Sequence, residues 1–149
     1  MNLLVFPKNY HSLPEMDQVR ILSTIKGTVD LSLISNKDTL KALKTMAAIK
    51  TIQHTNGEKA ANRYIISNNQ STLHVMQLYA MLKLVAFHEK LTVDVAPLFE
   101  TITDLENAPQ VMEDLYSNPE YAAHLKSRGN RQTIMLGFSD GTKDGGYLM

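Results

Sequence analysis

Residues 91–99 read LTVDVAPLF, a run in which β-branched and other apolar side chains predominate. Such a run predicts a buried strand. Pro97 stands near the end of the run, where a missing backbone donor disturbs a sheet least. Apolar runs at 64–66 and 132–138 predict two further strands, one on either side in the sequence.

Helical patterns separate the predicted strands. Apolar residues recur every three or four positions over 73–87 and predict a helix that packs one face on the sheet. After the second strand, Pro109 is expected to divide the chain into one helical turn and a new helix starting near Asn107. A further helix is expected over 118–129, which opens with Asn-Pro and closes with Arg-Gly. This alternating order predicts a parallel sheet with right-handed crossovers.

The first third of the chain is predicted to be helical. One helix is expected over residues 14–26, and a second is expected to begin at the SNKD sequence of residues 35–38 and to end at Asn56-Gly57. We therefore divide the chain into a helical segment, residues 1–60, and a β/α segment, residues 61–149, that carries the candidate site.

The predicted fold class is α/β: a partial parallel β/α barrel of about three strands with intervening helices, preceded by the helical segment. A complete barrel needs about 250 residues, and this chain has 149. A small open sheet is the alternative. The chain ends at Tyr147-Leu148-Met149, shortly after a glycine-rich run that is expected to lead into a full helix. We therefore expect the whole chain to be a fragment of one larger catalytic domain.

The composition excludes several classes of function. The 15 Lys and Arg residues balance 15 Asp and Glu residues, which removes the electrostatic argument for a nucleic-acid or membrane-surface partner. No run approaches the ~18 apolar residues of a membrane span, and the start lacks a signal peptide's basic region, so a cytoplasmic location is expected. The absence of Cys excludes thiolate metal ligands and a Cys nucleophile. Any metal must be held by oxygen or imidazole ligands.

Candidate chemistry lies at the carboxyl ends of the predicted strands, because parallel α/β sheets bind ligands at this edge. Glu100 follows the second strand, and Asp140 and Lys143 follow the third. Two carboxylates with no Cys or His nearby suit Mg2+ or Mn2+, which accepts one or two protein carboxylates and keeps several waters. The alternative is that each acid only caps a helix.

The glycine-rich run GFSDGTKDGG, residues 137–146, is predicted to form a strand-to-helix turn. Small residues and backbone amides at such a turn favour an anion, and Lys143 would add a full positive charge. The alternative is a flexible turn with a solvated lysine. The five histidines are interpreted as structural, since none forms a close metal-binding pair.

Several motifs together resemble the phosphoenolpyruvate carboxylase family. They are YIIS at 64–67, VDVAPLFETI at 93–102, LYSNPEYAAHL at 115–125, QTIML at 132–136 and GFSDGTKDGG at 137–146. The resemblance extends from residue 62 to the end of the chain and is weak over the helical first third. The PLFET and GxSDxxKDxG motifs are specific as a pair.

The resemblance implies an irreversible, bicarbonate-dependent carboxylation of phosphoenolpyruvate to oxaloacetate and phosphate at the carboxyl face of a β/α barrel. It implies Glu100 and Asp140 as the carboxylate ligands of Mg2+ or Mn2+. It also implies Lys143 as a catalytic residue that helps to hold the bicarbonate-derived anion. Ser139 and Gly141 would bind substrate beside Lys143. The full enzyme is expected to be a cytoplasmic homotetramer.

The chain departs from residues common in the family at Phe138 (often Tyr), Gly141 (often Ser), Gly145 (often Ala) and His74 (often Asp). These departures suggest a divergent bacterial branch. The family's catalytic histidine segment, arginine-glycine-rich loop and C-terminal regulatory region have no counterpart, so the isolated chain is expected to be inactive and, through exposed strand faces, to self-associate. Two alternatives remain open: a noncatalytic interaction module derived from the enzyme, and another phosphoenolpyruvate or pyruvate enzyme on a related barrel.

Overall fold

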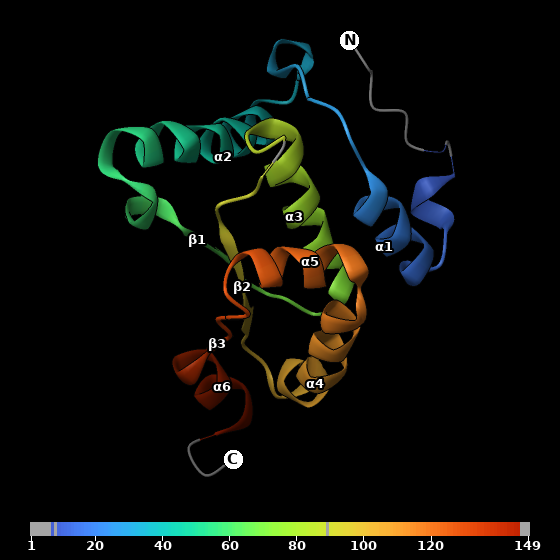
Figure 1. The fold of residues 1–149 in the computed structure, drawn as a ribbon. Coiled ribbons are helices and arrows are strands. Elements are labelled where there is room, and N and C mark those ends of the chain that lie inside the picture. The colour runs from blue at the N-terminus through green and yellow to red at the C-terminus, as the bar shows by residue number, and fades with distance from the viewer. Residues whose placement is uncertain (1–6, 8, 89, 147–149) are drawn as a thin grey trace.

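The computed structural model describes residue 7 and residues 9–88 and 90–146. Its centre is a three-stranded parallel sheet of order β1-β2-β3 with helices around it, which confirms the mixed α/β class (Figure 1). The described strands are β1 (Arg63–Ile66), β2 (Asp94–Phe99) and β3 (Met135–Leu136). The described α-helices are α1 (Glu15–Thr24), α2 (Lys37–Asn56), α3 (Thr72–Val85), α4 (Ile102–Ser117), α5 (Pro119–Ser127) and α6 (Phe138–Gly145). Short 3-10 helices cover Tyr10–Ser12, Leu31–Leu33 and Glu58–Ala61.

None of the helices in the described ranges combines the length and the apolar character needed to cross a membrane.

The central strand, β2, is paired on both sides although it contains Pro97. β1 pairs with residues 94–97, whereas β3 pairs only with residues 98–99. The backbone bonds of Asp94 and Leu98 both run to the β1 side of the strand. Because bonding sides alternate along a strand, the Pro97 nitrogen points away from β1. On that other side the ladder to β3 begins only at Leu98, so the sheet tolerates the proline.

The core forms around α3, which contacts α1, α2, α4 and β2. Nearly all of the side chains along α3 are buried or half-buried. Burying a large apolar side chain contributes about 1.5–3 kcal/mol, so this helix and β2 hold the layers together. The most deeply buried apolar side chains are Val75, Met76, Leu82, Val93, Val95, Phe99, Leu115 and Tyr121.

Helix ends follow local capping signals. The Asn36 side chain accepts a hydrogen bond of 2.9 Å from the Thr39 N–H, which fixes the start of α2. Gly57, with φ of 84°, ends that helix in a backbone conformation that suits glycine. The Asn118 side chain accepts bonds from the first amides of α5, which begins at Pro119 as expected.

The expected break at Pro109 is wrong, because α4 continues through it. Pro109 lies on the exposed side of the helix, whereas Val111 and Leu115 lie on its buried side. The bond that a proline cannot make would have gone to the carbonyl of Leu105, a residue that is 38% exposed. Water can reach this side, and the burial of the opposite face keeps the helix continuous.

The outer strands differ from the sequence prediction: β3 is shorter than expected, and β1 is more exposed. The run 132–138 yields only the two-residue strand β3, because Phe138 already belongs to α6. In β1, Ile65 is 51% exposed, so the strand is not fully buried. Both strands lie at the edges of the sheet, and no described element pairs with their outer sides.

Candidate functional site

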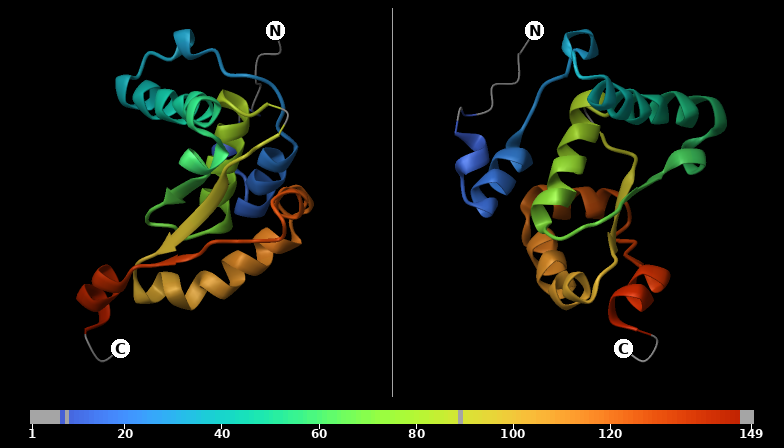
Figure 2. Two further views of the ribbon diagram at one scale, coloured as in Figure 1. Left: turned by 60° about the vertical axis from the view of Figure 1, so that its left-hand side comes forward. Right: turned by 180° about the vertical axis from the view of Figure 1, so that it is seen from behind.

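The carboxyl ends of the strands lie at one edge of the sheet, and α6 lies at this edge, at the far end of the molecule from α2 (Figures 1 and 2). Glu100 is half-buried and follows β2 directly. Asp140 and Lys143 are exposed and belong to α6. The sequence-predicted site residues therefore come from the same edge of the fold.

At this edge Gly137 packs closely on Glu100. A Cβ added to Gly137 would lie 3.0 Å from the Glu100 Cα and 3.2 Å from its Cγ. The Gly137 N–H also donates a hydrogen bond of 2.8 Å to the Phe99 carbonyl. One turn later, an added Cβ at Gly141 would lie 3.6 Å from the Glu100 carbonyl oxygen. The start of α6 therefore packs directly on the backbone that carries Glu100, and only glycine fits at position 137 without a shift.

The glycine-rich run does not form the expected turn, because residues 138–145 are helical. The N–H of Gly141 bonds to the Gly137 carbonyl at 2.9 Å, and the N–H of Gly146 bonds to the Thr142 carbonyl at 2.9 Å. These amides are used within the helix and are not free to bind an anion. Tertiary packing outweighs the local preference of the glycines here, since the run packs against the end of β2 and against α4.

The exposed face of α6 carries the charged candidates. The Lys143 Nζ lies 3.6 Å from the Asp140 Oδ1, one turn apart on the helix. No group of three or more His, Cys, Asp or Glu side chains suited to a metal occurs within the described part of the chain. A site built on Glu100 and Asp140 would thus offer two protein carboxylates, a number that Mg2+ accepts because it keeps several waters.

Two further carboxylates organise this edge. Asp104 is 4% exposed, and its carboxylate accepts hydrogen bonds from the N–H groups of Glu100 at 3.4 Å and Thr101 at 3.1 Å. The Thr101 side chain accepts in return from the Asp104 N–H, which completes a capping box at the start of α4. A capping box is expected from the sequence over residues 103–106, but the structure places it two residues earlier, on the TxxD spacing of residues 101–104.

Asp144 ties α6 to α4. Its carboxylate accepts a hydrogen bond of 2.8 Å from the N–H of Ile102, in the first turn of α4. A carboxylate at a helix N-terminus satisfies an otherwise unpaired amide and is favoured by the helix dipole. The contact spans 42 residues of sequence, so no local pattern could have predicted it.

Asn69, in the loop after β1, is a buried polar residue at the same edge. It is 0% exposed, and its N–H donates to the Leu98 carbonyl at 3.2 Å. Its side-chain Oδ1 and Nδ2 have no hydrogen-bond partner among the described residues. Leaving a buried amide without hydrogen bonds costs about 1–3 kcal/mol of stability. The Asn69 side chain at this edge is therefore available to form hydrogen bonds that the described residues do not supply.

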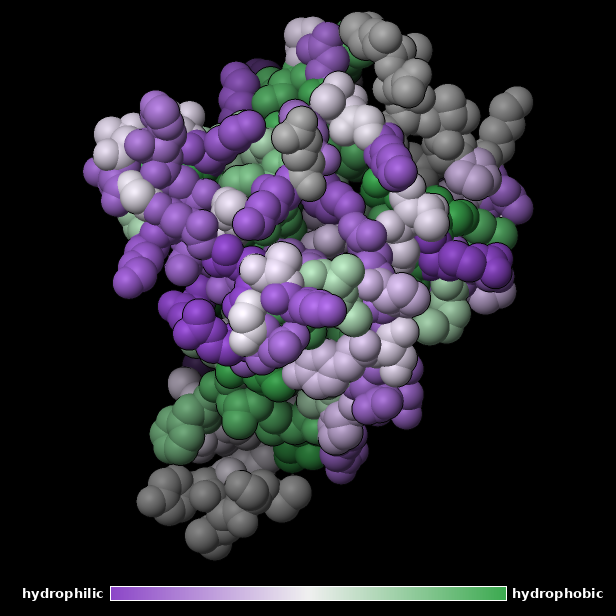
Figure 3. Space-filling model, in the orientation of Figure 1, coloured by the Kyte–Doolittle hydropathy of each residue, from purple (hydrophilic) through white to green (hydrophobic). Residues whose placement is uncertain are grey.

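Apolar side chains gather beside these groups at the α6 end of the molecule (Figure 3). Phe138 is 83% exposed and Leu136 is 64% exposed. They line an apolar hollow of about 530 Å³ between α4 and α6, together with Ile102, Leu105, Glu106, Gly137, Gly141, Thr142 and Gly146. Exposed apolar patches of this kind mark surfaces that another protein segment or a ligand covers.

A separate polar cluster joins α3 to α5 away from this edge. Burial lowers the pKa of His124, whose ring packs edge-on against Tyr79 at a centroid distance of 5.3 Å. Burial opposes ionisation of Glu120, but the hydrogen bond and charge of Lys83 hold the pKa of that carboxyl below its ordinary value. Burial raises the pKa values of Tyr79 and Tyr121. These contacts place His124 in the packed core, in keeping with a structural role.

Comparison with known proteins relates the whole chain to one family. Residues 1–149 match the family model described as phosphoenolpyruvate carboxylase. The chain is 38% identical over 150 residues to the phosphoenolpyruvate carboxylase of Nitrosomonas eutropha and 40% identical over 154 residues to that of Nitrosomonas europaea. It is 33% identical over 150 residues to the phosphoenolpyruvate carboxylase of Corynebacterium diphtheriae. Each alignment covers 95% of this chain and 16% of the relative, so the chain spans about one sixth of the length of these relatives.

Proposed function

The chain belongs to the phosphoenolpyruvate carboxylase family, and we propose that it supplies the metal-binding part of a site where phosphoenolpyruvate and bicarbonate give oxaloacetate and phosphate. The observation that carries this proposal is the contact between Gly137 and the backbone of Glu100. It joins the PLFET and GFSDGTKDGG motifs, which lie far apart in the sequence, at the ligand-binding edge of a parallel sheet.

In this proposal Glu100 and Asp140 hold Mg2+ or Mn2+. Two carboxylates with water and substrate oxygens form a suitable set for either ion. The ion, when bound, supplies positive charge that stabilises the negative charge developing on the substrate as the enolate forms. Asp104 is a positioning residue: its hydrogen bonds to the amides of Glu100 and Thr101 orient the backbone from which the Glu100 carboxylate extends.

Lys143 is proposed to hold the bicarbonate-derived anion, and Ser139 and Gly141 to line the substrate site beside it. Lys143 stands next to Asp140, with 3.6 Å between the Nζ and Oδ1 atoms. An ammonium group at this position would balance the charge of an incoming phosphate or carboxylate. The helical state of residues 138–145 favours the Lys143 side chain, rather than a cradle of backbone amides, as the group that holds the anion.

The surroundings of the site are proposed to be a partial β/α barrel, residues 61–149, preceded by the helical segment 1–60. The exposed edges of β1 and β3 support an incomplete barrel. Since the chain spans about one sixth of its relatives' length, we propose that it is inactive alone and self-associates through the apolar surface at Leu136 and Phe138. A homotetramer in the cytoplasm is the proposed form of the complete enzyme.

The decisive experiment measures bicarbonate-dependent oxaloacetate formation by a full-length family enzyme that carries this segment, across a Mn2+ titration. Glu100→Gln and Asp140→Asn should each abolish most activity and weaken the metal dependence. Glu113→Gln, which removes an exposed acid from α4, is the matched control and should leave both unchanged. Full activity in both site variants would contradict the assignment of these ligands.

A noncatalytic module is the second candidate, favoured by the exposed apolar surface around Phe138. It predicts that a full-length protein carrying this segment has no carboxylase activity while the 149-residue chain still associates. Another phosphoenolpyruvate or pyruvate enzyme on a related barrel would be active without bicarbonate. The same assay with and without bicarbonate therefore distinguishes the three functions.

A further inference from the structure

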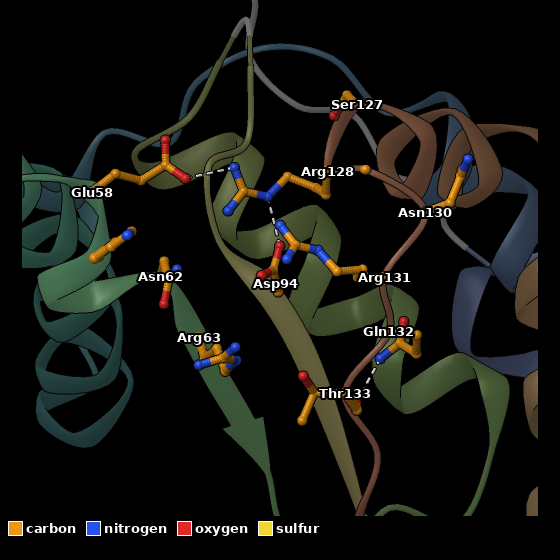
Figure 4. A pocket seen from close by; sticks show the side chains of 12 residues that line it. Glu58, Asn62, Arg63, Asp94, Ser127, Arg128, Asn130, Arg131, Gln132 and Thr133 are labelled. Atoms are coloured by element: carbon orange, nitrogen blue, oxygen red, sulfur yellow. Dashed lines mark hydrogen bonds and ion pairs between the residues drawn. The ribbon is translucent and has the colours of Figure 1, made fainter.

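A second cavity lies at the amino edge of the sheet, where the strands begin (Figure 4). It has a volume of about 940 Å³. Its walls come from the 3-10 helix Glu58–Ala61, from the first residues of β1 and β2, and from the segment 127–133, which starts at the last residue of α5. β2 has six residues, so about 20 Å separates this cavity from the carboxyl edge at ~3.3 Å per residue. The cavity is therefore distinct from the proposed carboxylase site.

Arg128 forms part of the wall of this cavity. Its Nε donates to the Asp94 carboxylate at 2.6 Å, and its Nη1 donates to Glu58 at 2.7 Å (Figure 4). The side chain is only 12% exposed, and the hydrogen bond to Asp94 raises the pKa of the guanidinium further. Both carboxylates of the cavity wall are thus already engaged by Arg128.

Lys59, Arg63 and Arg131 remain as three further cations in the same wall. All three are exposed, and none of them forms an ion pair with another described residue. They come from two stretches of sequence: Lys59 and Arg63 lie four residues apart where the chain enters β1, and Arg131 follows α5. The Arg131 side chain folds back along the turn at Gly129, where an added Cβ would lie 3.8 Å from the Arg131 Nε. Tertiary folding therefore concentrates these charges in one place.

The charges of the cavity do not balance, although those of the whole chain do. Four cationic residues face two carboxylates among the lining residues, which leaves two positive charges in excess. Asn62 and Asn130 add amide groups that can donate hydrogen bonds. A guanidinium group can donate two parallel hydrogen bonds to the oxygens of one phosphate. A polar concave site of this size fits a small molecule.

We propose that this cavity binds a small phosphorylated anion, with Arg63 and Arg131 as the groups that contact the phosphate and Lys59 adding charge. Arg128 holds the wall in place through Asp94 and Glu58, so the unpaired cations stand on a fixed scaffold. Their mutual repulsion is relieved when the anion enters. The chemistry selects a ligand with at least two negative charges, because a single charge would leave the excess uncompensated.

The test is calorimetric titration of the full chain with inorganic pyrophosphate, at constant ionic strength set by chloride. Arg63→Gln combined with Arg131→Gln should weaken binding by about tenfold, since each exposed charge contact contributes up to about fivefold. Lys41→Gln combined with Lys126→Gln removes two exposed charges elsewhere and should leave binding unchanged. Lys143→Gln should also leave it unchanged, which separates this cavity from the carboxyl-edge site.

Three results would overturn the proposal: no binding by the unaltered chain, equal weakening in the control pair, or weakening by Lys143→Gln alone. Arg63 and Arg131 form no ion pair with another described residue, so their loss should not unfold the chain. Amide chemical shifts of the unaltered chain give a second readout. Pyrophosphate should move the signals of residues 62–63 and 129–133, and shifts confined to α6 would contradict the assignment.

Discussion

Replacing Gly137 by Ala tests the contact on which the carboxyl-edge site depends. The backbone at Gly137 has φ of −80° and ψ of 90°, which alanine can adopt. The added Cβ, however, would lie 3.0 Å from the Glu100 Cα, 3.2 Å from its Cγ and 3.3 Å from the Phe99 carbonyl oxygen. The Glu100 Cα and the Phe99 carbonyl oxygen are backbone atoms at the end of the central strand, so only the Glu100 side chain could move aside by rotation. Overpacking of this kind costs about 1–3 kcal/mol.

Gly141→Ala is the matched control in the same helix. Its Cβ would lie 3.6 Å from the Glu100 carbonyl oxygen, an ordinary contact distance. Alanine is favoured over glycine by about 0.5–1 kcal/mol in a helix interior. The two substitutions add the same methyl group one turn apart, yet they should change the stability of this edge in opposite directions, with a difference of about 1.5–4 kcal/mol.

The assay is amide hydrogen exchange of α6, with urea unfolding to report global stability. Gly137→Ala should speed exchange at the Gly137 amide, which now donates to Phe99 at 2.8 Å, and along α6. Gly141→Ala should slow it. In a full-length enzyme Gly137→Ala should also weaken Mn2+ dependence, because α6 carries Asp140. Unchanged exchange in Gly137→Ala, or equal effects of both variants, would refute the packing of α6 on Glu100.

Three other substitutions test the scaffold. Arg128→Met should lower the free energy of unfolding by about 1–3 kcal/mol in urea titrations, because it leaves Asp94 half-buried without its partner. Adding salt to the unaltered chain should lower this free energy by less. An unchanged urea midpoint in Arg128→Met would contradict the role of the pair. Burial lowers the pKa of His124 below its ordinary 6.5, so the unfolded chain binds a proton more readily and stability should fall as the pH drops below about 6.5. Thermal unfolding between pH 7 and pH 5 should show this loss of stability. The loss should be smaller in His124→Phe but should persist in the control His54→Gln, which alters an exposed histidine. Equal pH dependence in all three chains would refute the assignment of this loss to His124. Asn69→Leu should raise or maintain stability, because it removes an unsatisfied buried amide; a loss above about 1 kcal/mol would mean that the amide has a partner.

The local pattern was sufficient for most element positions. Apolar periodicity and the caps at Asn36 and Asn118 located α2 and α5 correctly. The pattern failed where packing overrides local preference. Pro109 does not break α4, because the face opposite the proline is buried. The glycine-rich run becomes helical because it packs on Glu100 and because Asp144 ties it to α4.

The site was partly predictable. The acids at the strand ends could be selected because parallel strands bring their carboxyl ends to one edge. The hydrogen bond of the buried Asp104 joins residues three positions apart, so a local sequence motif can predict it. The ion pair of Arg128 with Asp94 joins residues 34 positions apart, so no local motif predicts it. The amino-edge cavity could not be predicted for the same reason: its cations come from two short stretches, residues 59–63 and 128–131, that only folding brings together, and the overall charge is zero.

The sequence by itself determined the element order, the α/β class and the family, since these depend on hydrophobic period, turn residues and motif letters. The tertiary structure alone decided which polar groups meet. It placed Gly137 on Glu100, engaged both cavity carboxylates with Arg128, and left Arg63 and Arg131 without an ion pair to any described residue. The physical reason is that electrostatic and steric contacts fall off over a few ångströms, and only chain folding sets distances between residues remote in sequence.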